Sequence, residues 1–144
     1  MQAKSILHPT DFSPVSQSAF QFACTLAKAR DYQLIVLHVQ NIGDTIMGEF
    51  GMVQPAPTET AQARHRLDTV EPPPPMRIER LLNRGDPAQQ ILAVARSTPC
   101  DLIVMGTRGH SALHDPLLGS VAAEVVRHAP CPVLTLTPQR GGSV

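Results

Sequence analysis

The sequence predicts an α/β fold in which a parallel sheet lies between two layers of helices, a three-layer sandwich. Two observations carry this prediction. The segments Leu34–Val39 and Asp101–Met105 are apolar at nearly every position, which is typical of strands covered by helices on both faces. Short apolar segments also alternate with helical patterns in the order βαβ(α)βαβαβ, the arrangement that right-handed crossovers build. With 144 residues, the chain 1–144 is expected to form a single domain.

The first quarter of the chain predicts a strand, a helix and a second strand. Ser5–Pro9 is a short apolar segment that a proline stops. Ser13 is a suitable N-cap and Pro14 a suitable first residue for a helix that runs to about Arg30. Residues at three- and four-residue spacing form the expected apolar face of this helix: Val15, Ala19, Phe22, Ala23 and Leu26. The strand Leu34–Val39 follows.

Residues 40–75 are the least regular part of the sequence. Glycines and prolines in its front half indicate a variable loop, and a weakly amphipathic helix is expected from Thr58 to Asp68. Pro72–Pro75 cannot continue a helix, so an extended, polyproline-like connector is expected there. A ligand for a PxxP-binding domain is the alternative, but no basic residues flank the prolines.

The second half predicts three further strands and two helices. Asp86 is a suitable cap and Pro87 a suitable first residue for a helix that ends near Thr98, with Gln89 completing a capping-box-like pair. The apolar stripe of this helix comprises Ala88, Ile91, Leu92 and Ala95. The other expected elements are strand Met76–Asn83, strand Asp101–Met105, helix Val121–His128 with Val121, Ala122, Val125 and Ala129 on one side, and strand Cys131–Leu136.

Composition narrows the class of protein. Twelve basic residues balance twelve acidic ones, so neither nucleic acid nor an anionic membrane is an expected partner. The longest apolar stretches, such as Leu102–Met105, are far shorter than the roughly 20 residues that cross a bilayer. The first residues carry no apolar h-region, so a soluble, cytoplasmic protein is expected. Cys24, Cys100 and Cys131 show no metal-ligand spacing and are expected to be buried, reduced thiols.

Two glycine-containing segments indicate an anion site at the carboxyl edge of the sheet, where ligands bind in such folds. Gly106 and Gly109 follow the strand Asp101–Met105 and allow the backbone to approach a ligand closely. Gly119 and Ser120 begin a helix whose first amides and dipole favour an anion. The alternative is that these glycines merely end a strand and start a helix.

The spacing Gly106-x2-Gly109-x9-Gly119-Ser120, within the surrounding DLIVMGTRG, resembles the nucleotide-binding signature of the universal stress protein family. The resemblance extends to ILHPTDFSP, GDPAQQIL and VVRHAPCPVLTL, and it covers nearly the whole chain except residues 40–75. It implies a five-stranded parallel sheet of order 3-2-1-4-5, an adenine nucleotide alpha-hydrolase-like, Rossmann-like fold. Because every signature glycine is present, the chain resembles the ATP-binding branch of the family.

The resemblance also implies a set of binding residues. Pro9, Thr10 and Asp11 would line the adenosine part, and Val39 would contact adenine through its backbone. The residues expected around ribose and phosphates are Met105, Gly106, Arg108, Gly109, Gly119, Ser120 and Val121. Asp11 has an alternative role as a turn residue whose carboxylate accepts from nearby amides. Magnesium or manganese would accompany ATP and be held mainly by phosphates and water, since no carboxylate cluster is present.

A binding module is favoured over an enzyme. His110, His114 and Asp115 could transfer protons, but no third group orients either imidazole. The motifs GxxxxGK[ST], GxGxxG after the first strand, and GxSxG are all absent. We therefore expect a regulatory or stress-response module controlled by ATP occupancy. The alternatives are a slow ATP-hydrolysing or autophosphorylating enzyme, and a ligand-free structural dimer or chaperone-like partner.

A homodimer is expected through the last strand. In the sheet order that the resemblance implies, Pro132–Leu136 lies at an edge, and its apolar residues invite pairing with a second copy.

Overall fold

The computed structural model describes residues 4–41, 47–48, 51–52, 57–107 and 118–138. Seven strands and four helices are found among these residues. The strands are β1 (Ser5–Pro9), β2 (Gln33–Asn41), β3 (Met47–Gly48), β4 (Gly51–Met52), β5 (Ile78–Gly85), β6 (Leu102–Gly106) and β7 (Val133–Leu136). The helices are α1 (Pro14–Arg30), α2 (Pro57–Asp68), α3 (Pro87–Ser97) and α4 (Ser120–His128).

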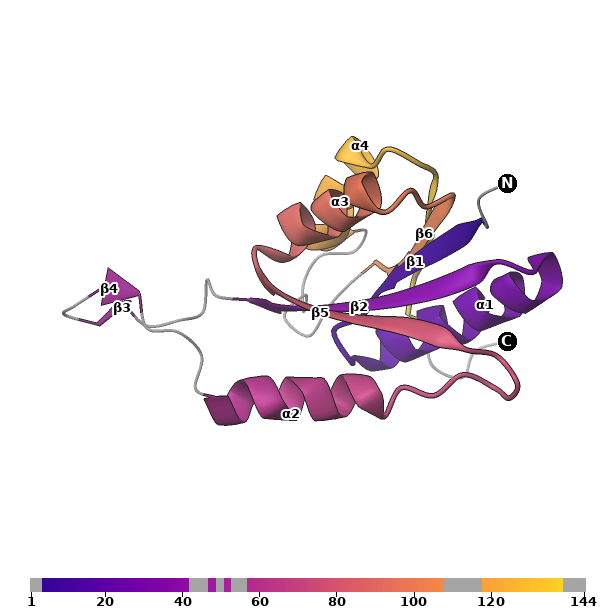
Figure 1. Ribbon diagram of the computed structural model, residues 1–144. Helices are drawn as coiled ribbons and strands as arrows, with labels where there is room; N and C mark the ends of the chain where they lie inside the picture. Colours follow the sequence, from indigo (N-terminus) through magenta and orange to yellow (C-terminus); the bar gives the residue numbers. More distant parts are fainter. Residues whose placement is uncertain (1–3, 42–46, 49–50, 53–56, 108–117, 139–144) are drawn as a thin grey trace.

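Five of the strands form one parallel sheet in the order β5-β2-β1-β6-β7 (Figure 1). Counted along the chain, these strands are in the order 3-2-1-4-5, so the predicted topology is confirmed. The short strands β3 and β4 pair antiparallel outside this sheet, within the segment expected to be a loop. Their two-residue length leaves too little apolar periodicity for the sequence to predict them.

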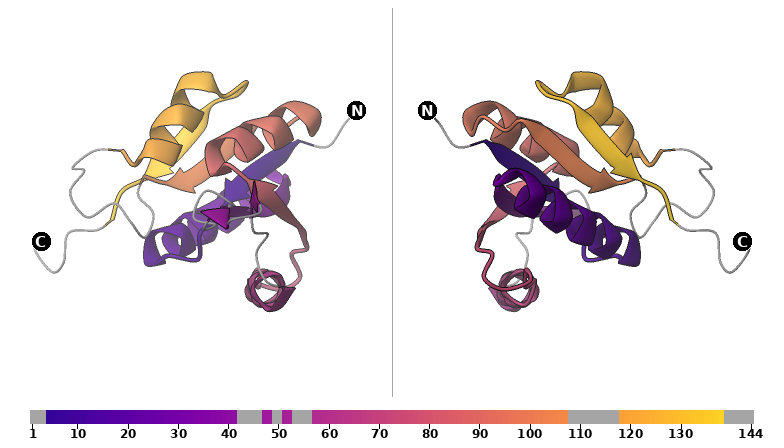
Figure 2. Two further views of the ribbon diagram at one scale, coloured as in Figure 1. Left: turned by 90° about the vertical axis from the view of Figure 1, so that its left-hand side faces the viewer. Right: turned by 90° about the vertical axis from the view of Figure 1, so that its right-hand side faces the viewer.

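Helices cover both faces of the sheet, with α1 and α2 on one side and α3 and α4 on the other (Figure 2). The strand residues alternate between two cores. In β2, Leu34 and Val36 face the α1/α2 side, whereas Ile35 and Leu37 face the α3/α4 side. All four are at most 1% exposed, as expected for strands that are apolar throughout.

Helix α1 begins and ends as its sequence predicts, and its expected apolar face is confirmed in part, because Ala19 and Ala23 are buried. Ser13 caps the helix by accepting from the amide of Ser16 at 3.2 Å. Phe20 and Cys24 are buried, whereas Phe22, expected in the core, is 40% exposed. Small residues, Ser16, Ala19, Ala23 and Ala27, are buried beside Phe20 and let the helix lie close to the sheet. Phe22 is on the opposite side of the helix and therefore faces the solvent.

The proline segment is a turn rather than an extended connector. The Pro74–Pro75 peptide is cis, and the amide of Met76 donates to the carbonyl of Pro73 at 3.0 Å. The chain leaving α2 has to reverse its direction to enter β5, which an extended segment would not achieve. As a result β5 begins at Ile78, two residues later than expected.

The three cysteines are free thiols, as expected, but only Cys24 is buried. Cys100 and Cys131 are half-buried, with their sulfur atoms 3.6 Å apart. Burial raises the pKa of Cys24 to about 11 and that of Cys100 to about 12, so both remain protonated at neutral pH. No helix in the described part of the chain is both long enough and apolar enough to span a bilayer.

A neutral histidine lies inside the sheet. His8, on β1, is fully buried, and its Nδ1 donates to the carbonyl of Val104 at 2.9 Å. Its Nε2 is buried and has no hydrogen-bond partner among the described residues. Burial lowers the pKa of His8 to about 4, although the bond to Val104 acts in the opposite direction.

Because His8 is buried in its neutral form, we expect the free energy of unfolding to decrease as the pH is lowered. Between pH 6.5 and 4 the unfolded chain binds a proton at His8 that the folded chain excludes, so the free energy of unfolding decreases as the pH falls through this window. Urea denaturation at pH 7 and pH 5 is expected to show a loss of about 1–2 kcal/mol from this residue. The variant His8→Leu should lose correspondingly less stability over the same interval. An identical loss in both proteins would contradict the assignment.

Candidate functional site

The carboxyl ends of β1 and β6 form the switch point of the sheet. These two strands are neighbours, but the chain leaves β1 toward α1 on one face and leaves β6 toward α4 on the opposite face. A crevice opens where two such connections diverge, and it is the usual ligand site of this class of sheet. The residues predicted to bind a nucleotide can be located relative to this point.

The β1 side of the crevice brings together Pro9, Thr10 and Val39. Pro9 is the buried last residue of β1. The amide of Thr10 donates to the carbonyl of Leu37 at 2.8 Å, which continues the pairing of β1 with β2 by one residue. Val39 lies two residues farther along β2 and faces the α3/α4 side. Strand β2 thus extends beyond the end of β1 and forms a wall of the crevice.

Asp11 has the turn role that was considered as its alternative. One of its carboxylate oxygens, Oδ1, accepts from the amide of Ser13 at 2.9 Å and from the hydroxyl of Ser16 at 2.6 Å. Ser13 caps α1 at the same time, so both residues hold the β1–α1 loop in place. The turn role does not exclude a ligand role, because a carboxylate can accept several hydrogen bonds.

On the β6 side, Met105 is buried beneath the crevice and Gly106 ends the strand. Gly106 has a packing role that the sequence did not reveal. A Cβ atom built on it would lie 2.6 Å from Cγ1 of Val15, in the first turn of α1. Because valine has a stiff β-branched side chain, this contact cannot be relieved by rotation alone. The close approach of α1 to β6 therefore requires glycine here.

The substitution Gly106→Ala is expected to lower the free energy of unfolding by about 1–3 kcal/mol, the usual cost of overpacking. Val15→Ala removes the opposing methyl groups, so the same substitution in that background should cost clearly less. Urea denaturation of the two single variants and the double variant measures this coupling. Strictly additive costs would contradict the packing role.

Thr107 is a site residue that the sequence analysis missed. It follows β6, is 2% exposed, and donates its amide to the carbonyl of Leu136 at 2.8 Å. Its own carbonyl accepts from the amide of Gly119 at 2.6 Å, and this bond ties the start of α4 to the end of β6. The Thr107 hydroxyl is buried and has no partner in the described part of the chain. The sequence signal that could have identified Thr107 is its position between two predicted site residues, Gly106 and Arg108.

The amide of Gly119 donates to the carbonyl of Thr107, so it is not one of the unpaired amides expected at the start of α4. The next residues fit the anion-binding role better. The first intrahelical bond of α4 runs from the amide of Ala123 to the carbonyl of Gly119, and no side chain caps the helix. Helix geometry therefore leaves the amides of Ser120, Val121 and Ala122 without an intrahelical acceptor.

The remaining predicted site residues, Arg108 and Gly109, lie outside the described residues, as do His110, His114 and Asp115. Within the described residues no group of three potential metal ligands is found. The start of α4 thus offers free amides close to Thr107, and the β1–α1 loop offers the carboxylate of Asp11. Free amides at a helix N-terminus suit an anionic ligand.

The order of the strands and the helices on both faces of the sheet define a doubly wound α/β protein. Proteins of this class bind their ligands at the carboxyl edge of the sheet. The family model described as "Universal stress protein family" matches residues 2–137, and the chain belongs to this family. A universal stress protein of Thermus aquaticus is 35% identical over 132 residues, covering 91% of this chain and 96% of its own. One from Methanocaldococcus jannaschii is 33% identical over 138 residues, covering 92% and 81%.

The fold agrees with solved members of the family. A second universal stress protein of Methanocaldococcus jannaschii, MJ0577, has a solved structure that matches with a TM-score of 0.81 at 25% identity. That match covers 98% of this chain and all of the other.

Proposed function

We propose that this universal stress protein binds ATP in the crevice between β1 and β6 and acts as a regulatory module in a stress response. The observation that carries the proposal is the meeting of two features at one point: the buried, unpartnered hydroxyl of Thr107 and the uncapped N-terminus of α4. The Thr107–Gly119 hydrogen bond holds these features together. Backbone amides at a helix start, with a hydroxyl beside them, form a site for phosphate oxygens.

Solved members of the family support an adenine nucleotide as the ligand class. One universal stress protein was solved in complex with cAMP, at 23% identity and a TM-score of 0.62. One from Archaeoglobus fulgidus was solved in complex with dAMP, at 22% identity and a TM-score of 0.63. Adenine would lie against the backbone of Val39, and Thr10 and Asp11 would contact the ribose side of the ligand.

In this proposal the phosphates contact the first amides of α4, with Ser120 and Val121 as donors. Arg108 and Gly109 are expected to complete the cradle, since guanidinium matches phosphate oxygens and glycine lets the backbone come close. A magnesium or manganese ion would be held mainly by phosphates and water.

The identity of the nucleotide is tested by denaturing the purified protein and analysing the released material by mass spectrometry. ATP is expected. Release of AMP or a cyclic nucleotide would support the crevice as the binding site but would show that the ligand is not ATP. If no nucleotide is released and added ATP does not raise the melting temperature, the ligand-free structural or chaperone-like role is favoured instead.

A regulatory module needs only slow turnover of its nucleotide. Steady-state phosphate release from ATP is therefore expected well below about 1 per second, the low end of ordinary enzyme turnover. A faster rate would favour the hydrolase or phosphotransferase alternative.

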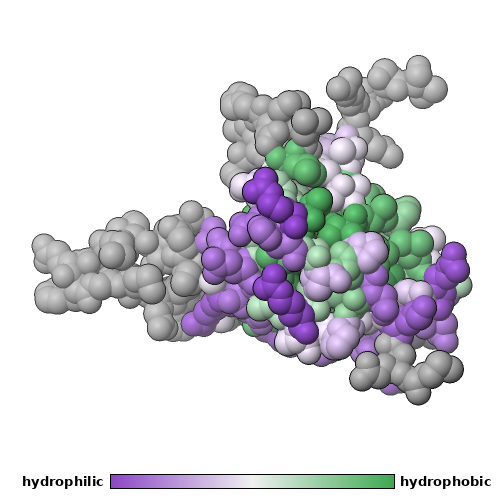
Figure 3. All heavy atoms as spheres, turned by 90° about the horizontal axis from the view of Figure 1, so that it is seen from above, coloured by the Kyte–Doolittle hydropathy of each residue, from purple (hydrophilic) through white to green (hydrophobic). Residues whose placement is uncertain are grey.

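We also propose that the protein forms a homodimer through β7. The two edge strands of the sheet differ in character: β5 carries charged residues along its length, Glu79, Arg80 and Arg84, whereas β7 carries none. Charges on an edge strand prevent pairing, and their absence permits it. Figure 3 looks onto the α3/α4 face and shows hydrophobic side chains gathered on part of it. On α4, Val126 is 47% exposed.

The register of β7 identifies which of its backbone groups can reach a second copy. Pro132 and Leu136 direct their carbonyls to β6, because these accept from Ile103 and Thr107. Strand alternation then turns the groups of Leu134 toward β6 and those of Val133 and Thr135 outward.

The variant Thr135→Pro is therefore expected to convert the dimer to a monomer, because it removes an outward amide and leaves the β6–β7 pairing intact. Light scattering at micromolar concentration measures the mass. Leu134→Pro, by contrast, removes an amide inside the sheet and should lower the melting temperature of the subunit itself. A wild-type mass of one chain would contradict the dimer.

A further inference from the structure

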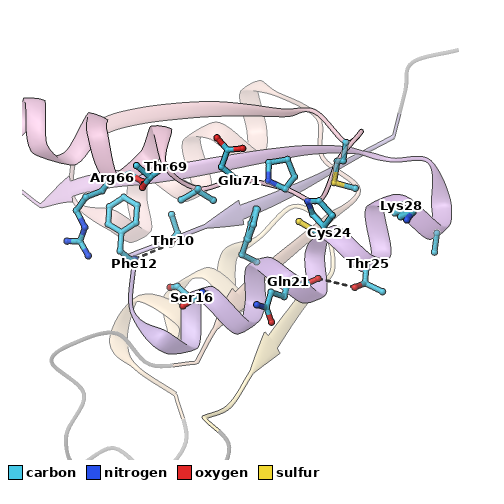
Figure 4. A pocket seen from close by; sticks show the side chains of 17 residues that line it. Thr10, Phe12, Ser16, Gln21, Cys24, Thr25, Lys28, Arg66, Thr69 and Glu71 are labelled. Atoms are coloured by element: carbon cyan, nitrogen blue, oxygen red, sulfur yellow. Dashed lines mark hydrogen bonds between the residues drawn. The ribbon is translucent and has the colours of Figure 1, made fainter.

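A long groove lies between α1 and the segment that runs from α2 through the proline turn (Figure 4). It is on the face of the sheet opposite to α3 and α4, and its volume is about 1260 Å³. Ser16 and Lys28 line it near its two ends and are separated by about 18 Å along the axis of α1. The groove is therefore elongated.

The middle of the groove is apolar. Phe20 and Cys24 on α1 face Val70 and Met76 across it, with two prolines beside them. The helices that border it have their backbone groups paired internally, so it offers no strand edge to an extended peptide. An unbranched hydrocarbon chain needs no hydrogen bonds and matches this lining.

The end of the groove at Phe12 carries the positive charge of Arg66. The guanidinium of Arg66 lies 4.5 Å from the centre of the Phe12 ring, and His38 contacts that ring at 4.4 Å between ring centres. The face of the Arg66 guanidinium is used for the cation–π contact with Phe12. Its N–H groups, which lie in the plane of the guanidinium, can still bind an anion. Arg66 has no carboxylate partner among the described residues. Its neighbour Arg64, by contrast, is paired with Asp68.

Phe12, at this end of the groove, has a strained backbone conformation. Its φ of 64° lies in the left-handed region, which bulky side chains adopt rarely. Such strain collects at ligand sites because surrounding contacts must hold it in place. Here the amide of Phe12 donates to the hydroxyl of Thr10 at 3.0 Å, and the ring lies at the groove against Arg66.

We propose that the groove binds a long-chain monocarboxylate, that is, a fatty acid. The carboxylate lies on Arg66 beside Phe12, and the chain runs over Phe20 and Cys24 toward Met76. Glu71 lines the groove between its ends and disfavours a negative charge in the middle of the chain, whereas Lys28 lies near the other end. A small compact anion would leave the apolar middle unfilled.

Calorimetric titration of dodecanoate, below its micellar concentration, into the full-length, nucleotide-free protein tests the proposal. Saturable binding is expected. Arg66→Gln should weaken it about tenfold, the effect of losing one charge-assisted contact. Gln21→Trp places an indole in the groove and should weaken it at least as much. Dodecanol, which has the same chain without the charge, should also bind about tenfold more weakly.

Two control variants show whether a loss of dodecanoate binding is specific to changes within the groove. Arg64→Gln changes an exposed arginine on the same helix, and Ser18→Trp adds an indole to α1 outside the groove lining. Both should bind dodecanoate as the wild type does. Absence of wild-type binding, or equal binding by Arg66→Gln and Gln21→Trp, overturns the proposal.

The variant Gln21→Cys provides an independent readout, because Gln21 is an exposed residue of the groove lining, whereas the native Cys24 is only 4% exposed. Dodecanoate should slow alkylation of the new thiol by N-ethylmaleimide, measured by peptide mass spectrometry, and leave the rate at Cys100 unchanged. An unchanged rate at position 21 would overturn the proposed path of the chain. The groove adjoins the nucleotide crevice at Thr10, but Gly119 lies at the start of α4 and does not line the groove. Dodecanoate binding should therefore persist in Gly119→Val, and the two proposals can fail separately.

Discussion

Replacing Gly119 with valine is expected to abolish ATP binding and leave the protein folded. Gly119 precedes α4 with φ −66° and ψ 163°, an extended conformation that valine adopts readily. Its hydrogen bond to Thr107 involves only backbone atoms and should persist. The new isopropyl group, however, would stand at the start of α4, where the phosphates are proposed to lie. A loss of affinity of at least about a hundredfold is expected, because no phosphate can then reach the amides.

The control for this variant is His128→Val, which places the same side chain at the exposed last residue of the same helix. It should bind ATP as the wild type does. Circular dichroism and the melting temperature of both variants establish that they are folded. If Gly119→Val binds ATP within about threefold of the wild type, the phosphates do not lie at α4.

Two substitutions at Asp11 are expected to separate its turn role from its ligand role. Asp11→Asn retains an oxygen that can accept from Ser13 and Ser16, so the loop and the stability of the unliganded protein should change little. It removes the negative charge, and ATP binding should weaken by about 1–3 kcal/mol, roughly ten- to a hundredfold. Asp11→Ala removes both the accepting oxygen and the negative charge. It should therefore weaken ATP binding and also lower the free energy of unfolding by about 1–2 kcal/mol.

Calorimetric titration with ATP and urea denaturation provide the two measurements. If Asp11→Asn binds ATP like the wild type while Asp11→Ala is destabilised, Asp11 is a turn residue only. If both variants lose affinity equally and neither loses stability, the hydrogen bonds to Ser13 and Ser16 contribute nothing measurable to the loop.

The fold could be predicted because its signals are local. Strands such as Leu34–Val39 are apolar at nearly every position, which indicates helices on both faces, and Ser13 and Asp86 mark helix starts by their capping chemistry. The position of Phe22 could not be predicted, because three-residue spacing fits several faces of a helix equally well. Which face is buried depends on the small residues that let α1 approach the sheet.

The site was predicted less completely, because its details depend on contacts between distant segments. Gly106 was expected at a ligand, and its packing against Val15, some ninety residues earlier in the chain, could not be predicted. The use of the Gly119 amide by Thr107 likewise depends on where α4 starts relative to β6. The groove beside Arg66 depends on the placement of α2 relative to α1, for which the irregular segment 40–75 gives no sequence signal.

The most direct test of the central claim is calorimetric titration of ATP into nucleotide-free wild-type protein, with Gly119→Val measured in parallel. For the wild type we expect saturable binding of about one ATP per chain and a rise in melting temperature with ATP concentration, and for the variant neither effect. No saturable heat and no rise in melting temperature in the wild type would contradict it.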